Sequence, residues 1–194
     1  MAVHGRWTSV IALALPSFIL AACQPAEEAE PVVSEREVPT PVEERVPVDT
    51  TAEALWAHLE AEDYAENWEF WPGKEPFYEG GEPHGVLLST YLNEPAAEGL
   101  PILMERDNVY ALPLGSIVVK ENYTPDSTLA AFTVMYKAEG YDGEHGDWFW
   151  MKRLADGTVE AEGRVEGCIS CHEQAADRYD LLLTAMSQAG QEDK

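Results

Sequence analysis

The sequence predicts an α+β fold, a mainly antiparallel β-sheet with an N-terminal helix and a C-terminal helix. Three observations lead to this prediction. Strand-like runs follow one another at short spacing, Gly, Pro and Asp residues separate them, and helical patterning is confined to the two flanks. Aromatic residues make up 10% of the chain, enough large side chains for a core.

The first 22 residues predict an exported chain. Met1 to Arg6 is short and basic, and Trp7 to Ala22 is almost wholly apolar, as in a secretory signal peptide. This apolar stretch contains Pro16 and is shorter than the roughly 20 residues of a membrane-spanning helix. We therefore expect residues 1–22 to be removed, with a retained transmembrane anchor as the alternative.

The end of this segment, Leu20-Ala21-Ala22-Cys23, resembles a bacterial lipobox, in which the cysteine thiol receives a diacylglycerol. The resemblance implies that Cys23 is the lipidated N-terminus of an exported lipoprotein on the periplasmic face of a bacterial membrane. Gln24 in the next position resembles the pattern that is sent on to the outer membrane, where the cell has one. A plain cleaved signal peptide is the alternative.

Residues 23–48 are predicted to form a disordered tether. Residues 24–48 contain five prolines, seven glutamates and no aromatic residue. Proline blocks helix and sheet hydrogen bonding and like charges extend the chain, at about 3 Å per residue. The globular domain is therefore expected to span residues 49–194.

A helix is expected at the start of this domain. Asp49, Thr50 and Thr51 can cap it, and Pro72-Gly73 ends the segment. The apolar residues near one face are Leu55, Trp56, Leu59 and Ala65.

Strands are expected over residues 86–92, 116–122, 129–137, 147–153 and 159–165, with a hairpin turn at 155–158. Alternation places Val118 and Lys120 on one face of their strand and Ile117 and Val119 on the other. A closing helix is expected over residues 173–187, with an apolar side formed by Tyr179, Leu182, Leu183 and Met186.

The charge balance excludes one class of partner and favours another. The chain has 12 Lys and Arg against 36 Asp and Glu, a formal charge of −24. Nucleic acid is excluded, because phosphate binding needs clustered basic residues. A basic partner is favoured.

The run Cys168-Ile169-Ser170-Cys171-His172 has the C-x-x-C-H pattern of a c-type haem attachment site. Two thiols at this spacing can each add to a haem vinyl group, and His172 can then bind the iron as proximal ligand. The alternatives are a redox disulfide and half of a zinc site. No second C-x-x-C run exists, and the other histidines are scattered along the sequence.

The haem motif near the C-terminus, together with three other segments, resembles the cytochrome P-460 family over residues 50–188. These segments are 115–123 (GSIVVKENY), 133–137 (TVMYK) and 140–150. The resemblance implies a mainly antiparallel sheet, a homodimer, five-coordinate haem c, and a lysine nitrogen joined covalently to the porphyrin. Lys120 matches that lysine.

The same resemblance implies a function. Members of the family oxidise hydroxylamine at an open haem iron site, and related β-type cytochromes c prime bind nitric oxide and carbon monoxide. We therefore expect a haem-dependent oxidoreductase that acts on a small nitrogen compound and passes electrons to a basic or membrane-associated cytochrome. A non-catalytic gas-binding or electron-transfer protein is the alternative.

Other residues are candidates for the haem pocket. Glu160, Glu162 and Glu166 precede the haem motif and could accept protons, but solvated surface positions are the commoner alternative. His84 could enter the distal side or be a bystander. An aromatic cluster could wall the pocket, although core packing is the stronger expectation for most of its members, which are Phe132, Tyr136, Trp148, Phe149 and Trp150.

Overall fold

The structure, a computed structural model, describes residues 47–105 and 110–192. The predicted signal peptide (residues 1–22), the lipidation site Cys23 and nearly all of the tether (23–48) lie outside the described residues. Among the helices of the described part, none combines the length and the apolar character that crossing a bilayer requires.

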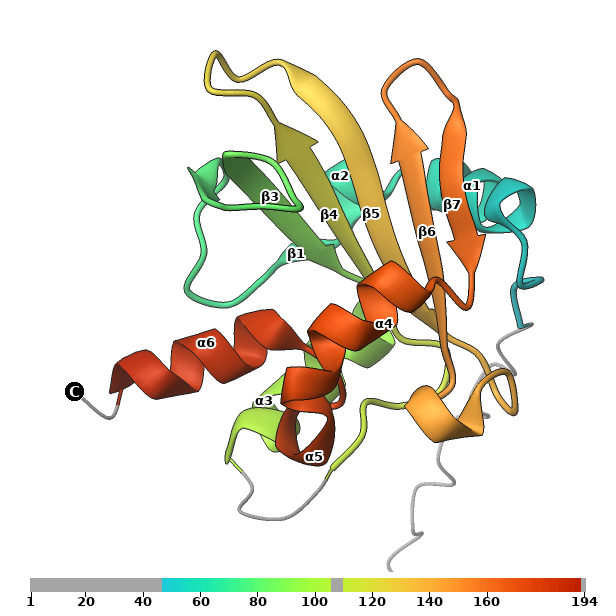
Figure 1. The fold of residues 1–194 in the computed structure, drawn as a ribbon, viewed down its shortest axis with the longest axis vertical. Helices are drawn as coiled ribbons and strands as arrows, with labels where there is room; N and C mark the ends of the chain where they lie inside the picture. Colours follow the sequence, from blue (N-terminus) through green and yellow to red (C-terminus); the bar gives the residue numbers. More distant parts are fainter. Residues whose placement is uncertain (1–46, 106–109, 193–194) are drawn as a thin grey trace, which may run out of the picture. The chain divides into compact units, whose positions relative to one another are not determined.

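Seven strands form one antiparallel sheet, which confirms the α+β prediction (Figure 1). The strand order is β1-β3-β4-β5-β6-β7, and β2 pairs with β3 outside this path. The strands are β1 (Glu69–Phe70), β2 (Tyr78–Glu79), β3 (Leu87–Leu92), β4 (Ile117–Tyr123), β5 (Leu129–Lys137), β6 (Trp148–Leu154) and β7 (Val159–Gly163).

The five long strands match the predicted runs, with small shifts at their ends. Strand β5 has the predicted bounds, and β7 ends two residues early because Gly163, with φ 93°, turns the chain into the next helix. Strands β1 and β2 contain two residues each, too short for an alternating pattern to be recognised.

The predicted N-terminal helix is present, but the segment is not one continuous helix. The segment forms α1 (Ala52–Ala61) and α2 (Tyr64–Asn67), because Asp63 adopts a left-handed conformation with φ 47° between them. The predicted start is confirmed, since the Thr51 hydroxyl accepts a hydrogen bond from the Ala54 backbone N–H at 3.2 Å.

A C-terminal helix follows the C-x-x-C-H motif, as predicted, but residues 173–187 do not form one continuous helix. Three helices occupy the C-terminal region, α4 (Glu166–His172), α5 (Ala176–Tyr179) and α6 (Leu183–Glu192). Asp180 and Leu181 have φ values of 49° and 64° and break the helical path. The Asp180 carboxylate is held by the buried Lys137 ammonium at 2.8 Å, so a tertiary ion pair overrides the local helical pattern.

Helix α3 (Glu94–Glu105) lies between β3 and β4, where no helix was predicted, so the expectation that helices are confined to the two flanks is wrong here. Pro95 lies in the first turn, where the missing N–H costs nothing, and Asn93 Oδ1 accepts from the Ala96 N–H at 3.2 Å. Pro101 lies further inside the helix.

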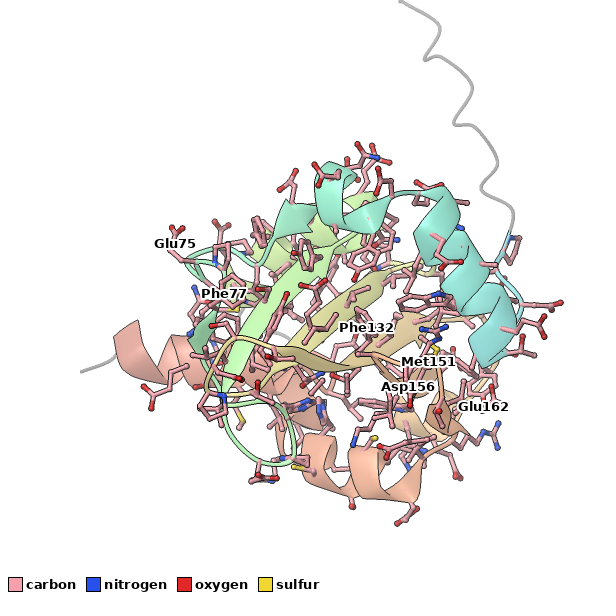
Figure 2. The ribbon with its side chains drawn as sticks, turned by 90° about the horizontal axis from the view of Figure 1, so that it is seen from above. Glu75, Phe77, Phe132, Met151, Asp156 and Glu162 are labelled. Carbon is pink, nitrogen blue, oxygen red and sulfur yellow. The ribbon has the colours of Figure 1, made fainter. Side chains whose placement is uncertain are left out.

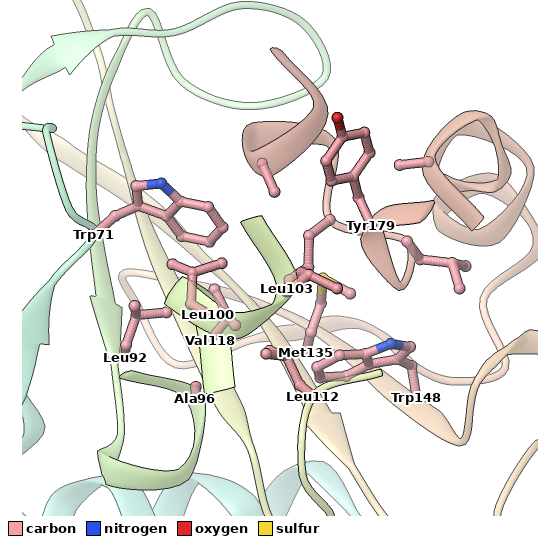
Figure 3. Close-up of a cluster of buried hydrophobic side chains, with 14 of the residues drawn as sticks. Trp71, Leu92, Ala96, Leu100, Leu103, Leu112, Val118, Met135, Trp148 and Tyr179 are labelled. Atoms are coloured by element: carbon pink, nitrogen blue, oxygen red, sulfur yellow. The ribbon is translucent and has the colours of Figure 1, made fainter. Parts of the chain in front are cut away.

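The two faces of the sheet carry separate apolar clusters. One face packs α1 and α2 against Ile117, Val119 and other side chains of the strands, including Phe132 and Met151 (Figure 2). The opposite face packs α3 to α6 against Val118 and its neighbours (Figure 3). The predicted alternation along β4 is therefore confirmed.

Candidate functional site

The C-x-x-C-H motif lies on helix α4, directly after the sheet ends. Cys168 and Cys171 are one helical turn apart, so their side chains share a face. Both thiols are free and half-buried. Burial raises the pKa of the Cys168 thiol, which disfavours the thiolate that a redox disulfide site requires.

His172, the last residue of α4, is buried and held in one orientation. Its Nδ1 lies 2.6 Å from the Leu181 carbonyl oxygen, which can only accept, so Nδ1 carries the proton and Nε2 carries the lone pair. The ring also packs edge-on against Trp150, with centroids 4.8 Å apart. Burial lowers the pKa of His172 to about 4, and the imidazole is therefore neutral at pH 7.

A cavity of about 380 Å³ brings the predicted site residues together. Cys168, Cys171, His172, Lys120 and His84 all border it. Much of its apolar lining comes from β4, β5, β6 and the start of α6, through Val118, Met135, Trp150 and Leu183, and from Leu182 directly before α6.

The sheet supplies a polar row to this cavity. Lys120 pairs across the sheet with Thr90 on one side and Thr133 on the other, and Thr133 pairs with Lys152. Directly opposed residues of an antiparallel sheet share a face. The neighbouring row on the same face is apolar and runs through Val118, Met135 and Trp150. The cavity therefore joins an apolar half to a half with polar groups.

Lys120 lies in this polar row with little to compensate its charge. Its Nζ makes one long hydrogen bond, 3.4 Å, to the Thr184 hydroxyl on α6. Burial, and to a lesser extent the charge of Lys74, lowers the pKa of Lys120 to about 8. At neutral pH, Lys120 is therefore the neutral, nucleophilic amine in a larger fraction of the molecules than an ordinary lysine would be.

His84 enters the cavity from the loop between β2 and β3. Its Nδ1 lies 3.2 Å from both Asn122 Oδ1 and Thr133 Oγ1. Burial, followed by the charges of Lys120 and His172, lowers the pKa of His84 to about 3. His84 is therefore a second neutral imidazole in the same cavity as His172.

The three glutamates considered as proton acceptors do not border this cavity. Glu160 pairs with Lys152 at 2.7 Å, and Glu166 is exposed in the first turn of α4. Glu162 accepts a hydrogen bond from the Ala52 N–H at 2.6 Å, at the start of α1 (Figure 2). Glu82, in the His84 loop, borders the cavity instead.

The aromatic cluster is mainly core, as expected. Trp150 borders the cavity, whereas Phe132, Tyr136 and Phe149 pack on the opposite face and Trp148 packs in the cluster with α3 to α6.

The residues around the cavity fit a covalent haem c. The motif supplies two thiols for thioether bonds and an oriented imidazole whose Nε2 is free of hydrogen bonds to the described residues, next to apolar walls. Within residues 47–105 and 110–192, no group of three His, Cys, Asp or Glu side chains is arranged to hold a metal ion by itself.

The sequence named His84 as a candidate but did not reveal Thr184, Trp71 or Glu82 as parts of this site. Thr133 could have been found, because strand alternation and hairpin pairing place it beside Lys120. Thr184 and Trp71 reach the cavity through tertiary packing between distant segments, which leaves no local signal.

A second cavity of about 650 Å³ lies elsewhere in the domain. Val48, Trp68, Leu92, Ile117 and Tyr136 are among the residues that border it, whereas Lys120, His84 and the three residues of the C-x-x-C-H motif do not.

Comparison of the sequence with protein-family models finds no match, and comparison with curated proteins finds no significant match.

Proposed function

We propose that the domain is a c-type haem protein resembling cytochrome P-460, with its haem in the cavity beside α4. A single observation supports this best. The two thiols and the imidazole of the C-x-x-C-H motif border the same cavity as Lys120, which lies 48 positions earlier in the sequence. A surface lysine would not share a buried cavity with this motif.

Each side chain has a distinct role in this proposal. Cys168 and Cys171 form the thioether bonds, and His172 binds the iron through Nε2. The Leu181 carbonyl fixes the orientation of the His172 ring, as outer-shell partners of metal-binding histidines commonly do. When bound, the haem supplies a redox-active iron that can bind a small nitrogen compound.

Lys120 is the residue proposed to join the porphyrin. Its lowered pKa favours the amine form, which has the lone pair needed for a new bond. The link replaces one N–H bond and one porphyrin C–H bond by an N–C bond. The two electrons and two protons released go to a peroxide, the class of oxidant proposed here.

The proposed reaction is the oxidation of hydroxylamine or a related small nitrogen compound, with electrons passed to a basic or membrane-associated cytochrome. The acidic chain would attract a basic partner, in a manner that salt weakens. Protons from the substrate need an acceptor. Of the groups that border the cavity, His84 and Glu82 are candidates.

A second function is favoured by one specific observation. Because Glu160, Glu162 and Glu166 do not border the cavity, the carboxylates predicted to accept protons are not available there. A non-catalytic protein that binds nitric oxide or carbon monoxide, or transfers electrons, needs no such acceptor.

The proposal extends to export and assembly. Residues 1–22 would be a signal peptide, Cys23 would carry the lipid, and the haem domain would lie on the periplasmic face of a bacterial membrane, the outer membrane if present. A homodimer is part of the same proposal.

The first test is the intact mass and ferrous absorption spectrum of the full chain, produced together with a c-type haem maturation system. We expect one covalent haem, absent from a Cys168→Ala/Cys171→Ala variant, and a red-shifted ferrous band that Lys120→Leu abolishes. An ordinary c-haem spectrum, unchanged by Lys120→Leu, would contradict the cross-link. A chain without haem would contradict the whole proposal.

Turnover then separates the two functions. The protein is mixed anaerobically with hydroxylamine and an electron acceptor, and nitrogen oxides are measured. Multiple turnovers support the oxidoreductase, whereas a stoichiometric spectral change without product supports ligand binding.

A further inference from the structure

The two neutral imidazoles in the cavity are related by a specific geometry. The ring centroids of His84 and His172 are 6.4 Å apart, and the ring planes are inclined by 78°. Two imidazoles that bind one metal ion from opposite sides have centroids roughly 6 Å apart, since each metal–nitrogen bond is about 2 Å and each ring adds its own radius. The observed separation matches this value.

Asn122 fixes the proton position on His84. Asn122 Nδ2 lies 2.9 Å from the Lys120 carbonyl oxygen and 3.2 Å from the Ala131 carbonyl oxygen, which can only accept hydrogen bonds. The amide oxygen Oδ1 must therefore be the atom that faces His84 and the Gly85 N–H, each at 3.2 Å. His84 Nδ1 is then the donor, and the lone pair lies on Nε2.

His84 and His172 thus have the same outer-shell arrangement. In each ring, Nδ1–H donates to an amide-type oxygen, from Asn122 in one case and from the Leu181 backbone in the other. No hydrogen bond to another described residue uses Nε2 of either ring. A histidine that donates its other N–H in this way is oriented to bind a metal.

The His84 loop is packed against the sheet and does not project freely. A Cβ at Gly85 would collide with the Tyr123 backbone, so this glycine allows the loop to lie directly on β4. The backbone N–H of His84 donates a hydrogen bond to the backbone carbonyl oxygen of Gly81 at 2.9 Å. The loop therefore holds His84 at a defined place.

From this geometry we propose that His84 Nε2 binds the haem iron opposite His172 when no external ligand is present, and that a small ligand must displace it. This inference rests on the proposed function, because it needs haem in the cavity. It differs from the five-coordinate iron that the family resemblance implies. The resting protein would be six-coordinate, and only ligands able to displace an imidazole would gain access.

Lys120 is the competing candidate, since its amine also borders the cavity. Two observations favour His84. Its Nδ1 is oriented by Asn122, whereas Lys120 Nζ bonds to Thr184. A ligand imidazole opposite His172 also accounts for the 6.4 Å separation.

The experiment uses the full chain with haem attached, in the ferric state and without added ligand. Resonance Raman and electron paramagnetic resonance spectra of the parent are expected to show six-coordinate, low-spin iron. In His84→Ala the iron is expected to become high-spin, and added imidazole should restore the low-spin spectrum. The ferrous variant should bind carbon monoxide about tenfold more tightly or better, because no internal ligand competes.

Two further variants complete the test. His58→Ala removes a histidine on α1 that does not border this cavity and should leave the spectra unchanged. His84→Met replaces imidazole by a thioether and should give low-spin iron with a sulfur-to-iron charge-transfer band. If His84→Ala does not fold, the comparison of the parent spectrum with that of His84→Met still tests whether residue 84 binds the iron.

Each remaining result overturns the inference. Five-coordinate iron in the parent protein would contradict it while leaving the proposed haem protein intact. Low-spin iron that survives in His84→Ala and His84→Met but is lost in Lys120→Met would assign the position to Lys120. Absence of attached haem would overturn the proposed function and this inference together.

Discussion

Two consecutive residues of β4, Lys120 and Glu121, bring charge into opposite faces of the same sheet with different results. Glu121 is buried and accepts hydrogen bonds from three phenols, those of Tyr64 at 2.8 Å, Tyr91 at 3.2 Å and Tyr123 at 2.5 Å. Lys120 makes one long hydrogen bond, to Thr184.

The difference in hydrogen-bond partners separates Glu121, whose charge serves the packing, from Lys120, whose charge the packing does not explain. A buried charge with a full set of partners helps to fix the packing around it, whereas an under-satisfied one costs stability and calls for another explanation. On the Glu121 face, the carboxylate has three hydrogen-bond donors. The Lys120 face has a cavity with two neutral histidines and a lysine of lowered pKa. The comparison therefore supports placing the proposed chemistry at the cavity that Lys120 borders.

The largest expected effect is a different response of the two faces to pH. The pKa values of His84 and His172, about 3 and about 4 in the fold, lie below the ordinary 6.5. As the pH falls, the two histidines are therefore protonated in the unfolded chain before they are protonated in the fold. Their contribution to the free energy of unfolding is fully present above pH 6.5 and is lost as the pH drops towards 4. In the Cys168→Ala/Cys171→Ala background, His84→Leu should lower the pH slope of unfolding free energy by about 1.4 kcal/mol per unit.

The opposite face should respond to alkali. Burial, together with Glu121, raises the pKa values of Tyr64 and Tyr91, and of Tyr123 on the same carboxylate. Their contribution to the free energy of unfolding is fully present below pH 10, the ordinary pKa of tyrosine, and is lost as the pH rises further. Urea denaturation across both pH ranges measures these slopes. Equal acid slopes in the parent and His84→Leu would contradict the assignment.

The next largest effect is expected at Glu121. In the same haem-free background, Glu121→Ala should lower the free energy of unfolding by about 3 kcal/mol, because buried phenols lose their common acceptor. Glu121→Gln keeps one acceptor oxygen and should cost about 1 kcal/mol. Equal losses in the two variants, measured by urea denaturation, would contradict this account, because Glu121→Gln keeps the side-chain volume and one acceptor oxygen.

Lys120→Met should act in the opposite direction. Replacing a poorly compensated, half-buried amine with an apolar side chain of similar length should raise the free energy of unfolding by about 1 kcal/mol in the haem-free background. A loss of stability as large as that of Glu121→Ala would remove the contrast between the two faces.

The smallest effect is expected at Thr184. Thr184→Val is nearly isosteric and removes the long hydrogen bond to Lys120 Nζ, so stability should change by less than about 1 kcal/mol. Thr128→Val, at an exposed turn outside the cavity, is a control for the substitution type. A larger loss at Thr184 would mean that this contact anchors α6.

The sequence predicted much of the sheet and the motif because both have local signals. Period-two patterns mark β3 to β7, and the C-x-x-C-H spacing marks Cys168, Cys171 and His172. Lys120 was found through family resemblance and strand alternation.

What the sequence did not predict depends on contacts between distant segments. The Lys137–Asp180 ion pair breaks a segment that looks like one helix. Asn122 gives His84 its orientation across 38 positions of sequence. Such features leave no periodic trace, which is why a histidine that looked like a bystander proved to border the cavity.

The order of the elements along the chain also has a consequence for maturation. In the described part of the chain, every strand precedes residue 164, whereas the C-x-x-C-H motif and the helices that complete the cavity follow it. Trp71 Nε1 donates to Gln188 Oε1 at 2.9 Å and ties α6 to a segment 117 positions earlier. A sheet formed first would keep the cavity side open until α6 docks, which would leave the two thiols accessible for the proposed haem attachment.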